Sequence, residues 1–286
     1  MLKRAFSRVR RRLSLHNEPG LPALDLRQFE ISERLFKGFP FLEPHRGASG
    51  ICDLHFQDRE LRGAIACTPA EATLLHLAAL NLKPQKALEI GSYIGWSSAH
   101  IASALDNKLT CVDPFLEIGS SLMEETSQCA KQRFLDNMAR CGLDQKIKLD
   151  CGKSPDILPE LVPNGGWDFA FVDGWHLDDQ PVRDLIGLLP YLQGEAVIIL
   201  HDPWIRDVRD GLVLLLLKGF NLYVCDTANY LTFCWRGQLT DGLRKTIAMS
   251  KTDRLTSHIS KERKAGFGLG LKTLDQLAAA GMATPS

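Results

Sequence analysis

The sequence has no excess of either charge, since 34 lysines and arginines balance 34 aspartates and glutamates among 286 residues. This balance argues against an enzyme that binds nucleic acid through a strongly basic surface. No apolar run approaches the roughly 20 residues that a membrane-spanning helix needs, and the longest, Leu212–Leu217, ends at Lys218-Gly219. The eight cysteines form no C-x-x-C pair and no secretory signal is recognised, so we expect a reduced, cytoplasmic setting.

Residues 1–66 are expected to form a basic arm and a cover segment outside the main domain. In residues 1–13, six lysines and arginines interleave with apolar residues, which predicts a basic helix with an apolar stripe. Such a helix suits an anionic membrane surface or an acidic partner, and the alternative is a solvated arm or a helix packed on a neighbouring subunit of a homodimer. Residues 20–66 carry Pro22, Pro40 and Pro44, and we expect irregular or short-helical structure there.

Residues 67–237 are expected to form one domain of alternating strands and helices. Thr68-Pro69-Ala70-Glu71 is a capping-box pattern that opens a helix through Leu80, and Lys83-Pro84 ends it. The alternation that follows predicts an α/β fold with a parallel sheet covered on both faces. Residues 238–286 are expected to form a polar helical extension with a break at Gly266–Gly270. The expected strands are Ala87–Ile90, Leu109–Val112, Ile147–Cys151, Phe169–Val172 and Ala196–Leu200. The expected helices lie near residues 96–105, 122–141, 154–161, 179–188 and 205–217.

The segment from residue 87 to residue 97 is an apolar strand that reaches a glycine turn and continues as a helix. Gly91 and Gly95 allow the backbone to pass close to a ligand, and the helix presents free N–H groups to a carboxylate. The next strand ends in Asp113, which suits a ribose diol. The turn reads G-x-x-x-G rather than the G-x-G-x-x-G of dinucleotide sites, and Glu89 would repel a pyrophosphate but attract an ammonium group. These features predict a nucleoside-containing cofactor.

The turn resembles motif I of class I S-adenosylmethionine-dependent methyltransferases, and is especially similar to the catechol and caffeoyl-CoA type of O-methyltransferase. The resemblance covers residues 87–202 and extends to bacterial enzymes of cephalosporin and macrocin clusters. It implies a Rossmann-like, doubly wound, mostly parallel seven-stranded sheet with an antiparallel last strand, made by the runs Asn221–Cys225 and Tyr230–Trp235. It also implies methyl transfer to a hydroxyl of a small acceptor such as a sugar, phenol, polyketide or glycan. The cofactor-binding residues expected from the turn, the strand ends and this resemblance are Glu89, Gly91, Ser92, Tyr93, Gly95, Ser97, Asp113, Gly152, Lys153, Ser154, Asp173, Gly174 and Trp175.

A carboxylate and a histidine follow the fourth strand of the predicted sheet. The resemblance implies that Asp173 binds a divalent cation, Mg²⁺ or Mn²⁺, and that His176 is the catalytic base. Asp202 is the expected second metal ligand, with His201 a third. Catechol enzymes follow the second aspartate with asparagine, whereas this chain has Pro203, which offers no side-chain oxygen. If the register shifts by one, His201 takes the aspartate position and Asp202 the asparagine position, and the imidazole then favours Mn²⁺, Fe²⁺ or Zn²⁺ over Mg²⁺.

Two other functions stay open at the level of the sequence. An NAD(P)-dependent oxidoreductase with a Rossmann fold would explain Asp113 and the glycine turn, but not the missing pyrophosphate spacing. A catalytically silent binding module would keep the fold without the chemistry. Single residues have structural alternatives too: His176 as a helix cap, His201 as a packing residue, and Trp96 and Trp175 as plain core aromatics.

Overall fold

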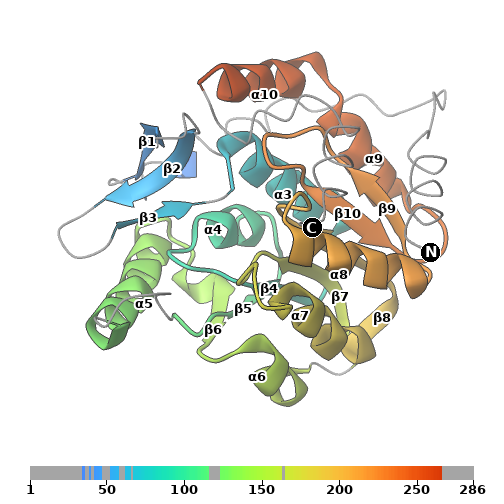
Figure 1. Ribbon diagram of the computed structural model, residues 1–286, viewed down its shortest axis with the longest axis horizontal. Coiled ribbons are helices and arrows are strands. Elements are labelled where there is room, and N and C mark those ends of the chain that lie inside the picture. Colours follow the sequence, from blue (N-terminus) through green and yellow to red (C-terminus); the bar gives the residue numbers. More distant parts are fainter. Residues whose placement is uncertain are drawn as a thin grey trace, which may run out of the picture.

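The computed structural model describes residues 34–35, 39, 42–46, 52–57, 62–65, 67–115, 123–162 and 165–265. The basic arm at residues 1–13 and the glycine break at residues 266–270 lie outside these residues. A seven-stranded sheet with the order β6-β5-β4-β7-β8-β10-β9 forms the centre of the molecule (Figure 1). No helix among the described residues is long and apolar enough to cross a membrane. The strands are β4 (Ala87–Ile90), β5 (Leu109–Val112), β6 (Ile147–Asp150), β7 (Trp167–Val172), β8 (Leu192–Leu200), β9 (Asn221–Val224) and β10 (Thr232–Trp235).

The register of the sheet brings the carboxyl ends of its central strands to one level. Strands β4 to β8 are parallel, and Ile90 is paired with Val112 on one side and with Val172 on the other. Val172 is paired in turn with Leu200 of β8. Strand β10 is antiparallel to both of its neighbours, with Thr232 opposite Leu200. The predicted parallel sheet with an antiparallel last strand is therefore confirmed. The residues that follow β4, β5, β7 and β8 lie side by side at one edge of the sheet.

Helices cover both faces of the sheet because its strands are apolar on both sides. In β7, Phe169 and Phe171 pack into the core layer that contains α3, α4 and α5, while Ala170 and Val172 pack into the layer with α6, α7 and α8. Helices α9 and α10 pack on α3 (Figure 1). The helices are α3 (Pro69–Leu82), α4 (Trp96–Ala102), α5 (Met123–Arg140), α6 (Ser154–Leu161), α7 (Gln180–Leu188), α8 (Arg206–Leu217), α9 (Asp241–Ser250) and α10 (Asp253–Ala265).

Among the residues that the structure describes, the cover segment differs in kind from the predicted architecture. Instead of irregular or short-helical structure, it contains a three-stranded antiparallel sheet of β1 (Leu42–Arg46), β2 (Cys52–Gln57) and β3 (Arg62–Ile65), blue in Figure 1. Proline argued against strands there. However, Pro44 lies in β1 at the edge of this sheet, where a residue without an N–H group is tolerated.

Candidate active site

The turn after β4 is joined by backbone hydrogen bonds to the strands on either side of it. The N–H of Gly91 donates to the carbonyl of Val112 at 2.9 Å, and the N–H of Asp173 donates to the carbonyl of Ile90 at 2.9 Å. Gly91 has φ +88°, and a Cβ atom there would collide with the carbonyl of Asp173. The position therefore requires glycine, both for its backbone conformation and for this close approach.

Asp113 holds the glycine turn from the neighbouring strand. Its Oδ2 accepts the N–H groups of Ser92 and Tyr93, each at 2.8 Å, and its Oδ1 accepts the N–H of Phe115 at 2.6 Å. Burial raises the pKa of Asp113, and these three N–H groups act in the opposite direction. The carboxylate is thus fixed in position at the cavity described next, where it lines the wall.

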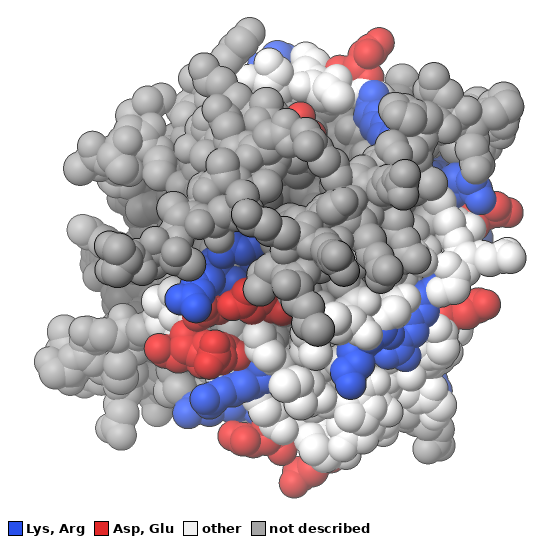
Figure 2. All heavy atoms as spheres, turned by 45° about the vertical axis from the view of Figure 1, so that its right-hand side comes forward, with Lys and Arg blue, Asp and Glu red and all other residues white. Residues whose placement is uncertain are grey.

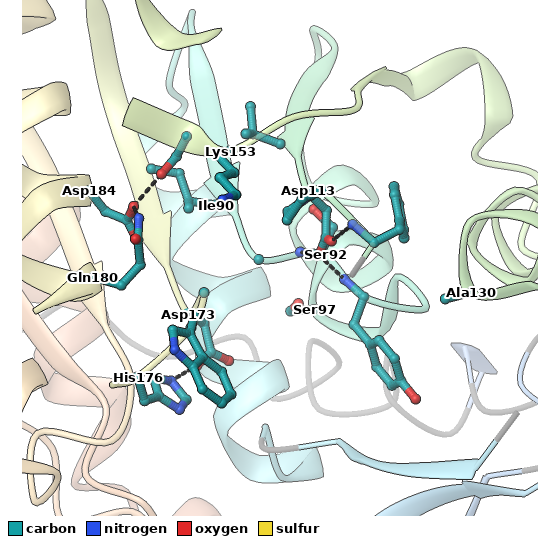
Figure 3. Close-up of a pocket in the computed structure, with 18 of the residues that line it drawn as sticks. Ile90, Ser92, Ser97, Asp113, Ala130, Lys153, Asp173, His176, Gln180 and Asp184 are labelled. Carbon is teal, nitrogen blue, oxygen red and sulfur yellow. Dashed lines mark hydrogen bonds and ion pairs between the residues drawn. The ribbon is translucent and has the colours of Figure 1, made fainter. Parts of the chain in front are cut away.

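A cavity of about 640 Å³ opens at these strand ends. In Figure 3, Asp113 and Ser92 lie on one side of it and Asp184 and Gln180 on the other, with Asp173 and His176 toward the lower edge of the view. The predicted site residues that line it are Gly91, Ser92, Tyr93, Ser97, Asp113, Lys153, Ser154, Asp173, Gly174, Trp175 and His176. The predicted residues that do not line it are Glu89, Gly95, Gly152, His201 and Asp202.

Glu89 lies beneath the turn, completely buried, and not on the cavity wall. Its Oε2 accepts hydrogen bonds from the hydroxyls of Ser92, at 2.9 Å, and Ser98, and from the thiol of Cys111 at 3.4 Å. Burial raises the pKa of Glu89 to about 7, against the effect of the surrounding hydroxyls, among them that of Ser97. Direct binding of an ammonium group by this side chain stays a prediction, while the structure adds a contact with the start of α4.

The far wall of the cavity comes from α7, which the sequence did not single out. Asp184, 2% exposed, accepts hydrogen bonds from the hydroxyl of Ser154 and, at 2.6 Å, from Nε2 of Gln180. Burial raises the pKa of Asp184, and its two hydrogen-bond donors oppose the rise. Arg183 also lines this wall. Helical periodicity marks α7 as amphipathic, but only the packed structure shows that its first turns face a cavity.

His176 and Asp173 form a pair at the edge of the cavity. Nε2 of His176 lies 3.0 Å from Oδ1 of Asp173 and 3.9 Å from Oδ2 of Asp202. Burial lowers the pKa of His176, but Asp173 and Asp202 raise it above its ordinary value. Because an ionised carboxylate only accepts hydrogen bonds, Nε2 carries the hydrogen in this contact.

Asp173 is also part of a compact group of potential metal ligands with His201 and Asp202. Nδ1 of His201 lies 3.0 Å from Oδ2 of Asp202 and 3.5 Å from Oδ1 of Asp173. The atom is buried, yet no described residue makes a well-formed hydrogen bond with it. Asp202 has φ +53°, a strained conformation that is found at functional sites, and its Oδ1 accepts the indole N–H of Trp204 at 2.8 Å.

The donor set of this group fits a divalent cation. Two carboxylate oxygens and one imidazole nitrogen lie within 4.8 Å of one another, and a proton or a metal ion between them relieves the repulsion of their lone pairs. Burial lowers the pKa of His201, but Asp202, Asp173 and Glu71 raise it well above its ordinary value. Burial raises the pKa of Asp173, while His201 and His176 lower it below its ordinary range. The group therefore attracts positive charge to its centre.

A family profile described as a methyltransferase domain matches residues 88–203. Over this segment the chain is similar to methyltransferases. A catechol O-methyltransferase from Niastella koreensis is 28% identical to this chain over 153 residues, 53% of this chain. The match spans 62% of that relative's length. The predicted resemblance is confirmed, and the dehydrogenase alternative is set aside.

Solved structures show the same fold as this methyltransferase domain. The O-methyltransferase TomG from Streptomyces achromogenes, involved in tomaymycin synthesis and solved in complex with SAM, has a TM-score of 0.51 and 22% identity, covering 61% of this chain and 83% of its own. An O-methyltransferase from Bacillus cereus, solved in complex with SAH, has a TM-score of 0.50 and 14% identity, covering 83% of this chain and 100% of its own.

Proposed function

We propose that the methyltransferase domain transfers a methyl group from S-adenosylmethionine to a hydroxyl group of a small acceptor, with a divalent cation and His176 assisting. The observation that carries the proposal is that Asp173 belongs both to the cavity and to the group of potential metal ligands. Its side chain lines the cavity and also belongs to the ligand group with His201 and Asp202. A cofactor in the cavity and a metal-bound acceptor would therefore meet at one residue.

The cavity suits the cofactor in size and in chemistry. Its volume of about 640 Å³ lies within the range of about 300–1,000 Å³ that is usual for small-molecule sites. Bound S-adenosylmethionine supplies an electrophilic methyl group on sulfur. In the proposed complex, Asp113 would accept hydrogen bonds from a ribose diol, and the start of α4 with Ser97 would hold a carboxylate. Asp184 and Ser154, which also line the cavity, would hold the nucleobase.

His176 is the residue that would take the proton from the acceptor. Since its Nε2–H donates to Asp173, the proton from the hydroxyl would go to Nδ1, and Asp173 would stabilise the imidazolium that results. Asp173, Asp202 and His201 would hold a divalent cation that lowers the pKa of the acceptor hydroxyl, and the imidazole ligand favours Mn²⁺ over Mg²⁺. The remaining catalysis is positioning of the two reactants.

A small, uncharged acceptor is consistent with the surroundings of the site. Trp175 is 38% exposed on the cavity wall and offers an aromatic face to a ring. On the face drawn in Figure 2, the described lysines and arginines are interspersed with aspartates and glutamates and form no single basic surface. Sugars, phenols, polyketides and glycans all remain in the proposed class, and nucleic acids do not.

The direct test is methyl transfer by the whole protein. S-adenosylmethionine would be supplied with panels of hydroxylated sugars, phenols and polyketides, and release of S-adenosylhomocysteine measured with added Mn²⁺ and with a chelator. We expect turnover with one of these classes and its loss on chelation. Cofactor binding without transfer to any acceptor would instead indicate a silent binding module, and transfer that is insensitive to chelation would remove the metal from the proposal.

A further inference from the structure

Glu71 lies in the first turn of α3, where the sequence predicted only a helix cap. The capping box is present: Oε2 of Glu71 accepts the N–H of Thr68 at 2.9 Å, and the hydroxyl of Thr68 accepts the N–H of Glu71 at 3.3 Å. The side chain is nevertheless completely buried, which a cap on an exposed helix end does not require. Burying a carboxylate costs free energy unless hydrogen-bond donors surround it. The other contacts of Glu71 are therefore described next.

The other contacts of Glu71 are made with His201, which follows β8, and with Asn229, which lies between β9 and β10. Its Oε2 lies 3.1 Å from Nε2 of His201, and its two oxygens accept the backbone N–H of Asn229 at 2.6 Å and the side-chain amide of Asn229 at 3.2 Å. Burial raises the pKa of Glu71, but His201 and the backbone N–H groups of Thr68 and Asn229 lower it below its ordinary value. Four hydrogen-bond donors thus surround the carboxylate, which acts only as an acceptor in these contacts.

This contact determines which nitrogen of His201 can bind a metal. Because the carboxylate of Glu71 meets only donors, Nε2 must carry a hydrogen. When a metal ion takes the place of the second ring proton, the lone pair that binds it is then on Nδ1. Nδ1 is the buried atom that points toward Asp173 and Asp202 without a well-formed hydrogen bond to any described residue. A histidine that binds a metal commonly donates its other N–H to a carboxylate, which fixes the tautomer and the ring orientation.

We propose that Glu71 is a positioning residue of the metal site: it holds His201 in the Nε2–H tautomer, so that Nδ1 binds a divalent cation together with Asp173 and Asp202. The inference rests on the metal site of the proposed function. It adds that α3, which precedes the matched methyltransferase segment, is needed to assemble that site. Glu71 does not line the cavity, so its effect on the cofactor itself should be small.

A second arrangement of the same residues is less favourable. The thiol of Cys67, the carboxylate of Glu71 and a ring nitrogen of His201 also lie close enough together to form a ligand set. Burial, however, raises the pKa of the Cys67 thiol well above its ordinary value, which disfavours the thiolate that binds metals. The Glu71 carboxylate is already occupied by its four donors. In this arrangement Glu71 holds the imidazole ring of His201 at Nε2, and Nδ1 is the atom that binds the metal ion.

The test compares Glu71→Gln with Thr68→Ala and the wild type. Gln is accepted at this position of a capping box, so Glu71→Gln keeps the helix start but no longer requires a hydrogen on Nε2. Thr68→Ala is the matched control, since it removes the cap hydroxyl and leaves the carboxylate in place. Calorimetry with Mn²⁺ alone, calorimetry with S-adenosylhomocysteine and thermal unfolding would be measured for all three proteins.

Glu71→Gln should weaken Mn²⁺ binding by about 10- to 100-fold and leave S-adenosylhomocysteine affinity unchanged, whereas Thr68→Ala should lower the melting temperature without changing Mn²⁺ affinity. On a His201→Asn background, Glu71→Gln should have no further effect on Mn²⁺. Equal Mn²⁺ affinity in wild type and Glu71→Gln would overturn this inference alone. A wild type that binds S-adenosylhomocysteine but no Mn²⁺ would overturn the metal site and this inference together, while the cofactor site would stand.

Discussion

His176 and Asp173 are joined by a contact of 3.0 Å between Nε2 and Oδ1, and Asp173 both lines the cavity and belongs to the group of potential metal ligands. Asp173 follows β7 directly, and the turn after that strand carries His176 over the cavity edge (Figure 3). This contact is the one that the proposed general base and its orienting carboxylate would need.

Replacing His176 with alanine should lower the rate of methyl transfer more than it lowers cofactor binding. The loss expected for a general base is about 10²- to 10⁴-fold in kcat, with S-adenosylhomocysteine affinity nearly unchanged. Kinetics and calorimetry on the same preparation measure both. His258→Gln is the control, because His258 is exposed on α10. Equal kcat in His176→Ala and wild type would contradict the assignment of the base.

Asp113→Asn should weaken S-adenosylhomocysteine binding by about tenfold or more, because hydrogen bonds to a charged group contribute about 1.5–3 kcal/mol each. The amide also has one oxygen fewer, so it could not accept the N–H of Phe115 as well as those of Ser92 and Tyr93. Asp150→Asn is the matched control, since Asp150 also ends a parallel strand but does not line the cavity. Calorimetry in which both variants bind like the wild type would remove Asp113 from the cofactor site.

Gly91→Ala should lower the free energy of unfolding by more than Gly219→Ala does. Both glycines have positive φ, +88° and +85°, so both substitutions carry a similar backbone penalty of about 1 kcal/mol or more. A Cβ at residue 91 would also collide with the Asp173 carbonyl, whereas nothing lies within 4 Å of a Cβ at residue 219. Urea unfolding measures the difference, and equal losses would show that the close approach between the turn and β7 is absent.

The strand ends could be predicted from the sequence, whereas some of their partners could not. Short apolar runs followed by Asp113 and Asp173 give the sheet and one part of the cavity wall, because parallel strands place their carboxyl ends together. Asp184 was not predicted as a site residue, since its position depends on how α7 packs against α6. Glu71 was predicted correctly as a cap, but its contact with His201, 130 positions away, exists only in the folded chain.

The small sheet β1–β3 could not be predicted because its strands are short and mixed in polarity. Five, six and four residues are too few for a clear alternation, and Pro44 reads as a break unless the strand is known to be at an edge. Buried β4 and β7 lack this ambiguity, since their residues are nearly all apolar. The central sheet could therefore be predicted from the sequence because its strands are buried on both faces.

Glu89→Gln should change how stability depends on pH. The pKa of Glu89 is about 7 in the folded protein against 4.5 ordinarily, so the folded state holds this proton more tightly than the unfolded state. Between these two pH values the unfolded chain ionises first, and the wild type loses stability as pH rises. The loss is about 3 kcal/mol, at about 1.4 kcal/mol for each pKa unit, and no change is expected above or below this window.

Urea unfolding of wild type and Glu89→Gln at pH 4.5, 6 and 8 measures this effect as the difference between the two proteins. The free energy of unfolding of the wild type should fall relative to the variant as pH rises. Parallel curves across this range would mean that Glu89 is ionised in the folded protein at pH values near its ordinary pKa.

The most direct test of the account is calorimetry of the whole protein with S-adenosylhomocysteine. We expect one molecule bound per chain, with binding weakened by Asp113→Asn and unaffected by Asp150→Asn. An absence of binding at millimolar S-adenosylhomocysteine, in a preparation shown to be folded, would contradict the proposal that this cavity is a methyltransferase cofactor site.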